Sequence, residues 1–413
     1  MSIEAGPRRM LAPFASRDFR FQWPADLLTS LAFEMEVLIL GWYVLVTTGS
    51  VFWLSVLGAL HYVGTLFAPG LGLLGDRIGL RNLLCLMRAT YATLAGTLTV
   101  LIATDQATLP VIFVVASLLG IVRPSDIGIR SALVSYSIPA QQLGGALALS
   151  RMTLDSARIA GALTGAGLFA AFGIGTAYIM VTASYIASLL LTMAISSPPR
   201  GAVEVRNSPF RDLVEGLRYV WSTPQLQAAM WVACLVNLTA FPISSQLMPY
   251  VAKNVYNLDQ TGLGFLVASF ATGALLGSIV LAALRNAVAS GRLMIITGVL
   301  WHLCLLGFAF TTTREVGMPL LIAAGFLQSL SMLSLSLLLL RTTDPAMRGR
   351  VMGVRMLAIY TLPLGLMLAG TLIPQIGYVA TAAGYAITGV TLMVGIGVLW
   401  RKSIWAPSGA ANA

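Results

Sequence analysis

Three carboxylates lie in the first long apolar stretch of the chain, where charged side chains are costly. Asp26 is near one end, and we expect it to be an interfacial charge, whereas Glu34 and Glu36 lie near the middle. Ionisable groups inside lipid usually face a cavity or a partner, and a desolvated carboxylate can exchange a proton near neutral pH. Glu34 and Glu36 point about 200° apart on a helix. One of them is therefore predicted to serve proton coupling or substrate contact, and the alternative is a structural salt bridge to an arginine.

Two later runs each place an acid between two arginines on one helix face. They are Arg123, Asp126 and Arg130 in the first run, and Arg151, Asp155 and Arg158 in the second. Residues three, four or seven apart share a helix face, and a short loop joins the runs. We therefore expect the two stripes to interlock. Arg123 is expected to reach a cavity and hold an anionic group there.

A short charged turn interrupts the apolar sequence at Gly72-Leu-Leu-Gly-Asp-Arg-Ile-Gly-Leu-Arg81. It is glycine-rich and carries Asp76, Arg77 and Arg81 where a long hydrophobic run must reverse. This pattern predicts a hinge or a latch in a protein that changes shape.

The composition places these groups in a membrane protein. Of the 413 residues, 57% are hydrophobic and 10% are charged, whereas a soluble chain carries about 25% charged residues. Apolar runs of about 20 residues can each cross the hydrocarbon core as a helix, and the alternating polarity of a β-barrel is not seen. We predict an all-α fold with twelve spans, at about 21–48, 53–75, 82–104, 109–131, 143–169, 175–195, 226–252, 260–284, 291–311, 316–340, 351–374 and 377–400.

The basic residues indicate the orientation of these spans. The net charge is +10, and most arginines fall near even-numbered connections or the ends, whereas Lys253 and Arg314 lie on the other side. By the positive-inside rule, both ends are expected in the cytoplasm of a multi-pass protein of the inner membrane. The same asymmetry argues against nucleic-acid binding. The three cysteines lack metal-ligand spacing, and we expect neither a metal nor a cofactor.

The twelve predicted spans divide into two halves around a polar segment. We expect an N-terminal half at 1–197, a linker at 198–224 and a C-terminal half at 225–413. Ser208-Pro209 predicts a helix start in the linker, and the apolar spacing that follows predicts a short amphipathic helix on the inner membrane surface. The alternative is a plain tether, that is, a segment that only connects the two halves.

The two halves are weakly similar to one another at an offset of about 205 residues. The fifth and eleventh spans are both glycine-rich, and each reaches a short turn, at Gly173 or Gly377. Gly161 and Gly165 are predicted to allow close helix packing. Duplicated six-helix halves are a known plan of transporters.

These features together resemble the major facilitator superfamily. Gly72, Asp76, Arg77, Gly79 and Arg81 fit the family loop between spans two and three, although Leu80 replaces a usual basic residue. The segments Trp42 to Ser50, Ser156 to Arg158 and Arg348 to Gly353 are similar to the branch of enterobactin and multidrug exporters. Ala116 stands where related drug exporters carry a basic residue, so proton antiport does not follow from the resemblance itself.

The resemblance implies a cytoplasmic gate. It assigns gating to the loop residues above and to Asp126, Arg130, Asp155 and Arg158; the alternative is static helix packing. It further implies a monomeric efflux carrier rather than an enzyme, with a small-molecule substrate, protons and membrane lipid as partners.

The favoured interpretation is a proton-coupled exporter, by alternating access, of small amphipathic molecules such as a siderophore or drug. Replacing Glu34 by Gln should then abolish uphill transport but allow exchange. A second interpretation is an importer of a small organic anion held by Arg123. The third, a membrane receptor or enzyme, lacks support because the chain has no phosphate-binding loop and no His-Glu-x-x-His pair.

Overall fold

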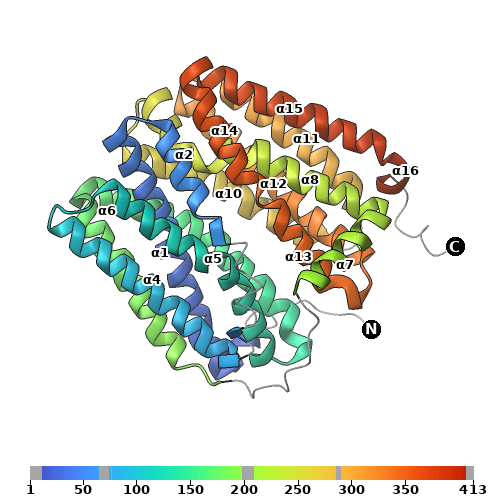
Figure 1. The fold of residues 1–413 in the computed structure, drawn as a ribbon, viewed down its shortest axis with the longest axis horizontal. Helices are drawn as coiled ribbons and strands as arrows, with labels where there is room; N and C mark the ends of the chain where they lie inside the picture. Colours follow the sequence, from blue (N-terminus) through green and yellow to red (C-terminus); the bar gives the residue numbers. More distant parts are fainter. Residues whose placement is uncertain (1–11, 65–73, 76, 198–208, 285–289, 406–413) are drawn as a thin grey trace. The chain divides into compact units, whose positions relative to one another are not determined.

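The computed structural model describes residues 12–64, 74–75, 77–197, 209–284 and 290–405, and in these residues the regular structure is helical, without strands (Figure 1). Ten of the described helices are long and apolar enough to cross a membrane. Internal hydrogen bonding makes a helix one of the few structures that can span lipid. This agrees with the all-α membrane fold predicted from the sequence.

The chain divides into two compact units, Met1–Leu40 with Leu60–Glu204, and Gly41–Ala59 with Val205–Ala413. The division near residue 204 falls inside the predicted linker. The end of the first predicted span and the start of the second, Gly41–Ala59, group with the second unit, although they precede the linker in sequence.

The first unit is built mainly from long helices. They are α1 (Arg17–Thr48), whose last residues belong to the second unit, α4 (Leu80–Ala103), α5 (Leu109–Ser137) and α6 (Ala140–Met193). α6 covers two predicted spans, and at Gly173 the backbone leaves the helical region, with φ 79° and ψ 173°. α6 is therefore two helices that meet at a sharp turn.

The second unit contains the remaining helices. They are α2 (Val51–Leu60), α7 (Pro209–Ser222), α8 (Pro224–Phe241), α9 (Met248–Tyr250), α10 (Gln260–Leu284), α11 (Ser290–Ala309), α12 (Arg314–Thr342), α13 (Arg348–Ala358), α14 (Thr361–Ile376), α15 (Tyr378–Leu399) and α16 (Arg401–Ile404). Two π-helical turns, Pro242–Gln246 and Val251–Val255, continue α8 on either side of α9. The predicted second span extends past α2 into residues 65–73, which lie outside the described residues.

The internal repeat predicted from the sequence is visible in the backbone. Gly377, between α14 and α15, has φ 84° and ψ 164°, close to the values at Gly173. Side chains other than glycine rarely adopt such positive φ values. Both units therefore join their last two long helices through a glycine of the same conformation.

Glycine contacts between helices repeat as well. A Cβ at Gly161 of α6 would meet the Leu31 carbonyl oxygen of α1 at 2.8 Å, and a Cβ at Gly365 of α14 would meet the Leu238 carbonyl oxygen of α8 at 2.2 Å. The fifth helix of each half thus approaches the backbone of the first at the corresponding glycine. Such close approach is typical of helix packing within membranes.

The predicted linker helix is present as α7, and it packs against α13. Arg350 of α13 donates to Asp212 at 2.8 Å and lies 3.2 Å from a Glu215 oxygen. Tyr219 donates to the Asp344 carboxylate at 3.1 Å. The linker helix is therefore attached to the segment that precedes the eleventh predicted span, which a plain tether would not require.

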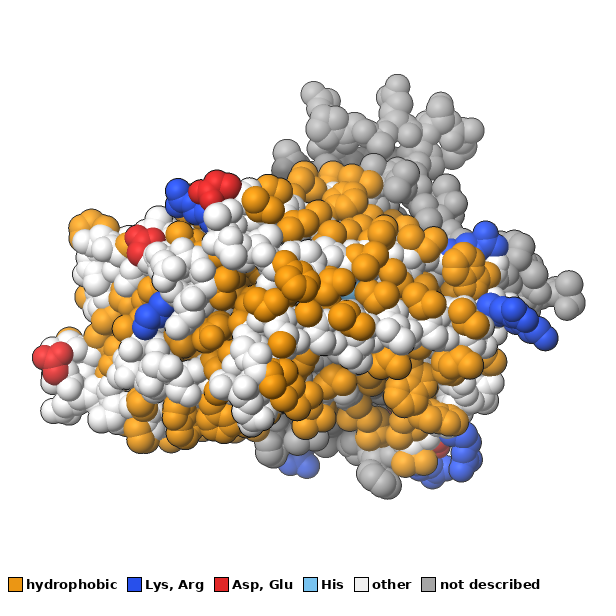
Figure 2. All heavy atoms as spheres, turned by 90° about the horizontal axis from the view of Figure 1, so that it is seen from above, with side chains coloured by type: hydrophobic (Ala, Val, Ile, Leu, Met, Phe, Trp, Pro, Cys, Tyr) orange, Lys and Arg blue, Asp and Glu red, His pale blue; other side chains and the backbone are white. Residues whose placement is uncertain are grey.

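The surface has the character expected of a protein in lipid. Figure 2 shows one face covered mainly by hydrophobic side chains, with charged side chains near its two ends. Many large apolar side chains are exposed, for example Phe172 at 67% and Leu399 at 76%. Exposed apolar surface of this extent is unusual in a soluble monomer and indicates contact with a membrane.

Candidate functional site

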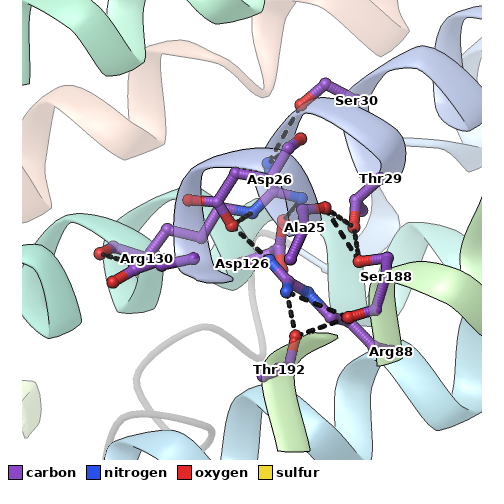
Figure 3. Close-up of polar contacts among 10 residues, drawn as sticks. Ala25, Asp26, Thr29, Ser30, Arg88, Asp126, Arg130, Ser188 and Thr192 are labelled. Carbon is purple, nitrogen blue, oxygen red and sulfur yellow. Dashed lines mark hydrogen bonds and ion pairs between the residues drawn. The ribbon is translucent and has the colours of Figure 1, made fainter. Parts of the chain in front are cut away.

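A buried ionic cluster ties together three helices of the first unit (Figure 3). Asp26 of α1 forms ion pairs with Arg88 of α4 and, at 3.6 Å, with Arg130 of α5. Arg130 also pairs with Asp126, one turn earlier on α5. The side chains of Arg88 and Asp126 are completely buried. Two acids and two arginines give this cluster, here called the α1 cluster, a net charge of zero.

Hydrogen bonds extend the α1 cluster to α6. Arg88 donates to the Thr192 hydroxyl, and Ser188 donates to the Ala25 carbonyl at 2.8 Å. On the other side, Arg130 donates to the Ser30 hydroxyl at 3.0 Å. A charge-neutral, hydrogen-bonded arrangement is the condition under which buried ions are tolerated. The four long helices of the first unit are thus joined by polar contacts.

The α1 cluster is too tightly packed to hold a substrate. A cavity of about 30 Å³ borders Asp26, Ser30 and Arg130, which is enough for about one water molecule. Sites for drug-sized ligands occupy roughly 300–1,000 Å³. The contacts of the cluster are all among residues in helices of the first unit. Asp26 is buried in it, at 9% exposure, so the expectation of an interfacial charge is wrong.

Glu36 occupies a separate buried site between α1 and the second part of α6. Its carboxylate is fully buried and accepts hydrogen bonds from Tyr178 at 3.0 Å and from Tyr185 at 2.9 Å. Tyr185 in turn packs against Tyr91 of α4, with ring centroids 5.4 Å apart. Among the described residues Glu36 has no ion-pair partner within 4 Å. A buried carboxylate is thus held by neutral phenol groups.

Glu34 has a different environment, as its opposite direction on α1 predicts. Its carboxylate lies 3.5 Å from the guanidinium of Arg158 on α6, and both side chains are partly exposed. Gly161, one turn after Arg158, brings the two helices together, because a Cβ there would lie 2.9 Å from the Glu34 Cβ. A Cβ added at Gly165 would likewise lie 3.0 Å from the Met35 Cα atom of α1. Glu34 therefore forms the kind of pair that the structural alternative describes.

Arg123 of α5 lies over an aromatic ring of α1. Its guanidinium carbon is 3.5 Å from the centre of the Phe33 ring, a cation–π geometry. The Nη1 atom is buried and has no hydrogen-bond partner among the described residues. Because Phe33 lies on α1, Arg123 faces the helix that also carries Glu36.

The two predicted Arg–acid–Arg stripes each lead to α1. Arg130 reaches Asp26, and Arg158 reaches Glu34. Within the second stripe, Arg151 lies 3.5 Å from Asp155, whose side chain is buried. The expected interlocking of the stripes is replaced by these contacts, because α1 carries carboxylates that face both helices.

The charged turn is only partly within the described residues. Gly72 and Asp76 lie outside them. Arg77 is exposed, and Gly79 precedes α4 with φ 88°. Arg81 donates to the Met193 carbonyl at the end of α6. The turn therefore joins α4 to the last residues of the first unit's final helix.

Sequence reasoning missed three residues of these sites: Arg88, Tyr178 and Tyr185. Arg88 shares a helical stripe with Leu84, Tyr91 and other buried residues of α4, and a basic residue on a buried stripe signals a buried partner. The two tyrosines are seven residues apart, which places them on one helix face. That spacing alone does not indicate a carboxylate between them.

Comparison with known proteins agrees with this architecture. A sequence model of a family described as transmembrane secretion effector matches residues 8–407. The multidrug efflux pump Tap of Mycolicibacterium fortuitum is 30% identical over 173 residues, 41% of each chain. The enterobactin exporter EntS of Citrobacter koseri is 26% identical over 259 residues, 62% of this chain and 61% of the relative. The matched regions thus span less than two thirds of these relatives.

Solved structures show the same fold over nearly the whole chain. The nucleoside transporter NupG superposes with a TM-score of 0.71 at 13% identity, covering 93% of this chain and 99% of that one. The human organic anion transporter MFSD10 gives 0.68 at 15% identity, covering 95% and 99%. The relatives and the fold of the present chain are those of transporters, not of enzymes. The chain belongs to the transmembrane secretion effector family and is a transporter of the major facilitator type.

Proposed function

We propose that this transporter is a proton-coupled exporter of small amphipathic molecules, such as a siderophore or drug, working by alternating access. The observation that carries the proposal is Glu36, a fully buried carboxylate bonded to two phenol hydroxyls and free of ion pairing within the described residues. A coupling group must bind and release a proton, and a fixed countercharge close to a carboxylate favours its ionised form.

The surroundings of Glu36 make its two protonation states structurally different. An ionised carboxylate accepts hydrogen bonds from both Tyr178 and Tyr185, whereas a protonated one also carries an O–H donor that needs an acceptor, and its hydroxyl oxygen is a weaker acceptor. The tyrosines lie on the second part of α6, and Glu36 lies on α1. Protonation would therefore alter the contact between these helices.

Glu34 suits this task less well than the sequence suggested. Its carboxylate has a fixed partner, the Arg158 guanidinium at 3.5 Å. The proposal therefore assigns proton exchange to Glu36 and helix association to Glu34. The α1 cluster, with Asp26, Arg88, Asp126 and Arg130, has no net charge, and it is assigned to holding the first unit together.

The direction of transport is proposed from the relatives. The multidrug efflux pump and the enterobactin exporter both move substrates outward, as their names state. Gating by Asp76, Arg77, Arg81 and Asp155 remains part of the proposal, whereas the contacts of Asp126, Arg130 and Arg158 within the first unit favour the alternative of static helix packing. The bond from Arg81 to the Met193 carbonyl supports it for that residue.

A second candidate function is import of a small organic anion. It is favoured by Arg123, whose buried Nη1 has no hydrogen-bond partner among the described residues. A carboxylate or phosphate could accept from that nitrogen. The two functions share the fold and differ in direction, so a transport assay with defined sidedness separates them.

The test uses inside-out membrane vesicles that carry the wild-type protein or a variant. Respiration acidifies the interior of the vesicles. A pH-sensitive reporter then shows whether protons leave the interior when a candidate substrate is added, which can be a dye, an antibiotic or a siderophore. Wild-type vesicles should accumulate a substrate and release protons. Glu36→Gln should lose accumulation against a gradient but keep substrate exchange.

Glu34→Gln is the matched control, because it makes the same chemical change two residues away. It should keep proton release if Glu36 is the coupling group. Wild-type proton release by Glu36→Gln would refute the assignment. Substrate uptake by right-side-out vesicles, abolished in Arg123→Gln, would instead support the importer.

A further inference from the structure

An apolar groove on the second unit ends in two basic side chains. It has a volume of about 770 Å³ and runs between α11 and the end of α15. Ile296 and Leu300 line one side, and Val394 and Val398 line the other; all four side chains are exposed. Arg401 and Lys402 line the end of the groove just after α15.

A fixed tryptophan forms the wall at the basic end. The Trp405 indole nitrogen donates to the Gly397 carbonyl at 3.1 Å, and the Trp405 carbonyl accepts from Arg292 at 3.1 Å. The Arg292 guanidinium also lies 5.9 Å from the Trp405 ring centre. These contacts hold the ring beside Arg401 and Lys402. Tryptophan is typical of the membrane interface, where one part of a side chain is apolar and another is wet.

The charge at this end is uncompensated. In the part of the chain that the structure describes, neither Arg401 nor Lys402 forms an ion pair, and no acidic residue lines the groove. Both side chains are exposed. Basic residues at the end of a groove between membrane helices are suited to an anionic lipid headgroup.

The dimensions suit a lipid lying in one leaflet. From Val394 to Leu399, α15 rises about 8 Å at 1.5 Å per residue, and Arg401 and Lys402 follow directly in α16. One leaflet contributes about half of a 30 Å hydrocarbon core. The apolar walls would contact acyl chains, while Arg401 and Lys402 would lie at the level of the headgroups. The positive-inside pattern predicts that this end lies at the inner leaflet.

We propose that this groove binds one anionic phospholipid, with its phosphate held by Arg401 and Lys402 and its acyl chains lying along α11 and α15. The ligand class follows from the chemistry of the groove: an apolar channel with two cationic groups and a tryptophan at one end. The proposal is independent of the direction of transport and of its coupling ion.

Native mass spectrometry of the detergent-purified full chain tests the proposal. Phosphatidylglycerol and phosphatidylcholine with identical acyl chains are added in parallel. One tightly bound phosphatidylglycerol is expected, with weaker binding of phosphatidylcholine. Each basic residue near an anionic surface contributes about a fivefold factor in affinity, so the double variant Arg401→Gln/Lys402→Gln should bind phosphatidylglycerol about 30-fold more weakly.

Two matched controls accompany this variant. Lys253→Gln/Arg314→Gln removes two positive charges from the other predicted side of the second unit and should leave binding unchanged. Leu300→Trp fills the groove and should weaken the binding of both lipids, whereas Leu392→Trp, at an exposed α15 position outside the groove, should not. A single symmetric peak in size-exclusion chromatography establishes that each variant is folded.

Three results would overturn the proposal. The first is equal affinity for the two lipids in the wild type. The second is unchanged phosphatidylglycerol binding after removal of Arg401 and Lys402. The third is tenfold or greater tightening after deletion of residues 406–413, which would make that segment of the chain the occupant of the groove.

Discussion

Removing the Asp26 carboxylate should destabilise the first unit strongly. Asp26→Asn keeps the size of the side chain but takes one negative charge from the α1 cluster, in which Asp26 pairs with Arg88 and Arg130. The remaining charges are those of the two arginines and Asp126. A cluster that was neutral then carries one uncompensated positive charge next to the completely buried Arg88 side chain.

The expected magnitude follows from the burial of these groups. The Asp26 side chain is 12% exposed and that of Arg88 is 0% exposed, so solvent screens the pair poorly. Removing one partner of a buried ion pair costs about 3–5 kcal/mol. For a unit of this size, a loss of that order lowers the unfolding temperature by about 10 °C.

Reaction of a native cysteine with a fluorogenic reagent measures this change. Cys85 lies on α4, three residues before Arg88, and is only partly exposed. In a Cys234→Ser/Cys304→Ser background, Cys85 reports unfolding of the first unit alone. The purified protein is heated in detergent, and the midpoint of labelling is compared between variants.

The charge balance supplies the critical comparison. Asp26→Asn/Arg88→Gln restores net neutrality and should recover at least half of the loss. Asp105→Asn, the same chemical change at an exposed turn residue, should shift the midpoint by less than 2 °C, because surface substitutions have small effects. The reasoning is refuted if Asp26→Asn behaves like Asp105→Asn, or if the double variant is no more stable than Asp26→Asn.

Two further predictions concern the second unit. Gly389→Ala should cost about 3 kcal/mol by thermal unfolding, because the added Cβ would lie 1.9 Å from the Cδ2 atom of the buried His302. Gly395→Ala on the same helix, with no atom within 4 Å of the added Cβ, is its control, and an equal loss there would contradict the packing argument. Arg350→Gln should release α7 from α13, so limited proteolysis within α7 should become faster. High salt should have the same effect on the wild type, because salt screens partly exposed ion pairs. A cleavage rate insensitive to both changes would rule out the electrostatic attachment.

The helices and the repeat could be predicted from the sequence because both depend on local properties. The predicted span 260–284 matches α10 at both ends, and the predicted turns at Gly173 and Gly377 both have positive φ, 79° and 84°. A membrane helix needs about 20 apolar residues and satisfies its own backbone. The loop motif with Arg77 and Arg81, together with the spans and the repeat, indicated the superfamily.

The partners of the charged residues could not be predicted in this way. The sequence separated Glu34 from Glu36 by direction, since two residues differ by about 200° on a helix, but it did not say which faces an arginine. Hydropathy along the first span predicted that Asp26 is an interfacial charge. It gave no indication of the partner Arg88, which lies 62 residues later in the chain.

The sequence by itself therefore determined that the chain is helical, spans a membrane and repeats an internal plan, because hydrophobic length and glycine turns act within one segment. Only the tertiary structure decided that Glu34 pairs with Arg158 and that Glu36 lies between Tyr178 and Tyr185. These contacts join residues more than 120 positions apart. They depend on how α1 and α6 pack, and hydropathy along one helix carries no information about the face of another.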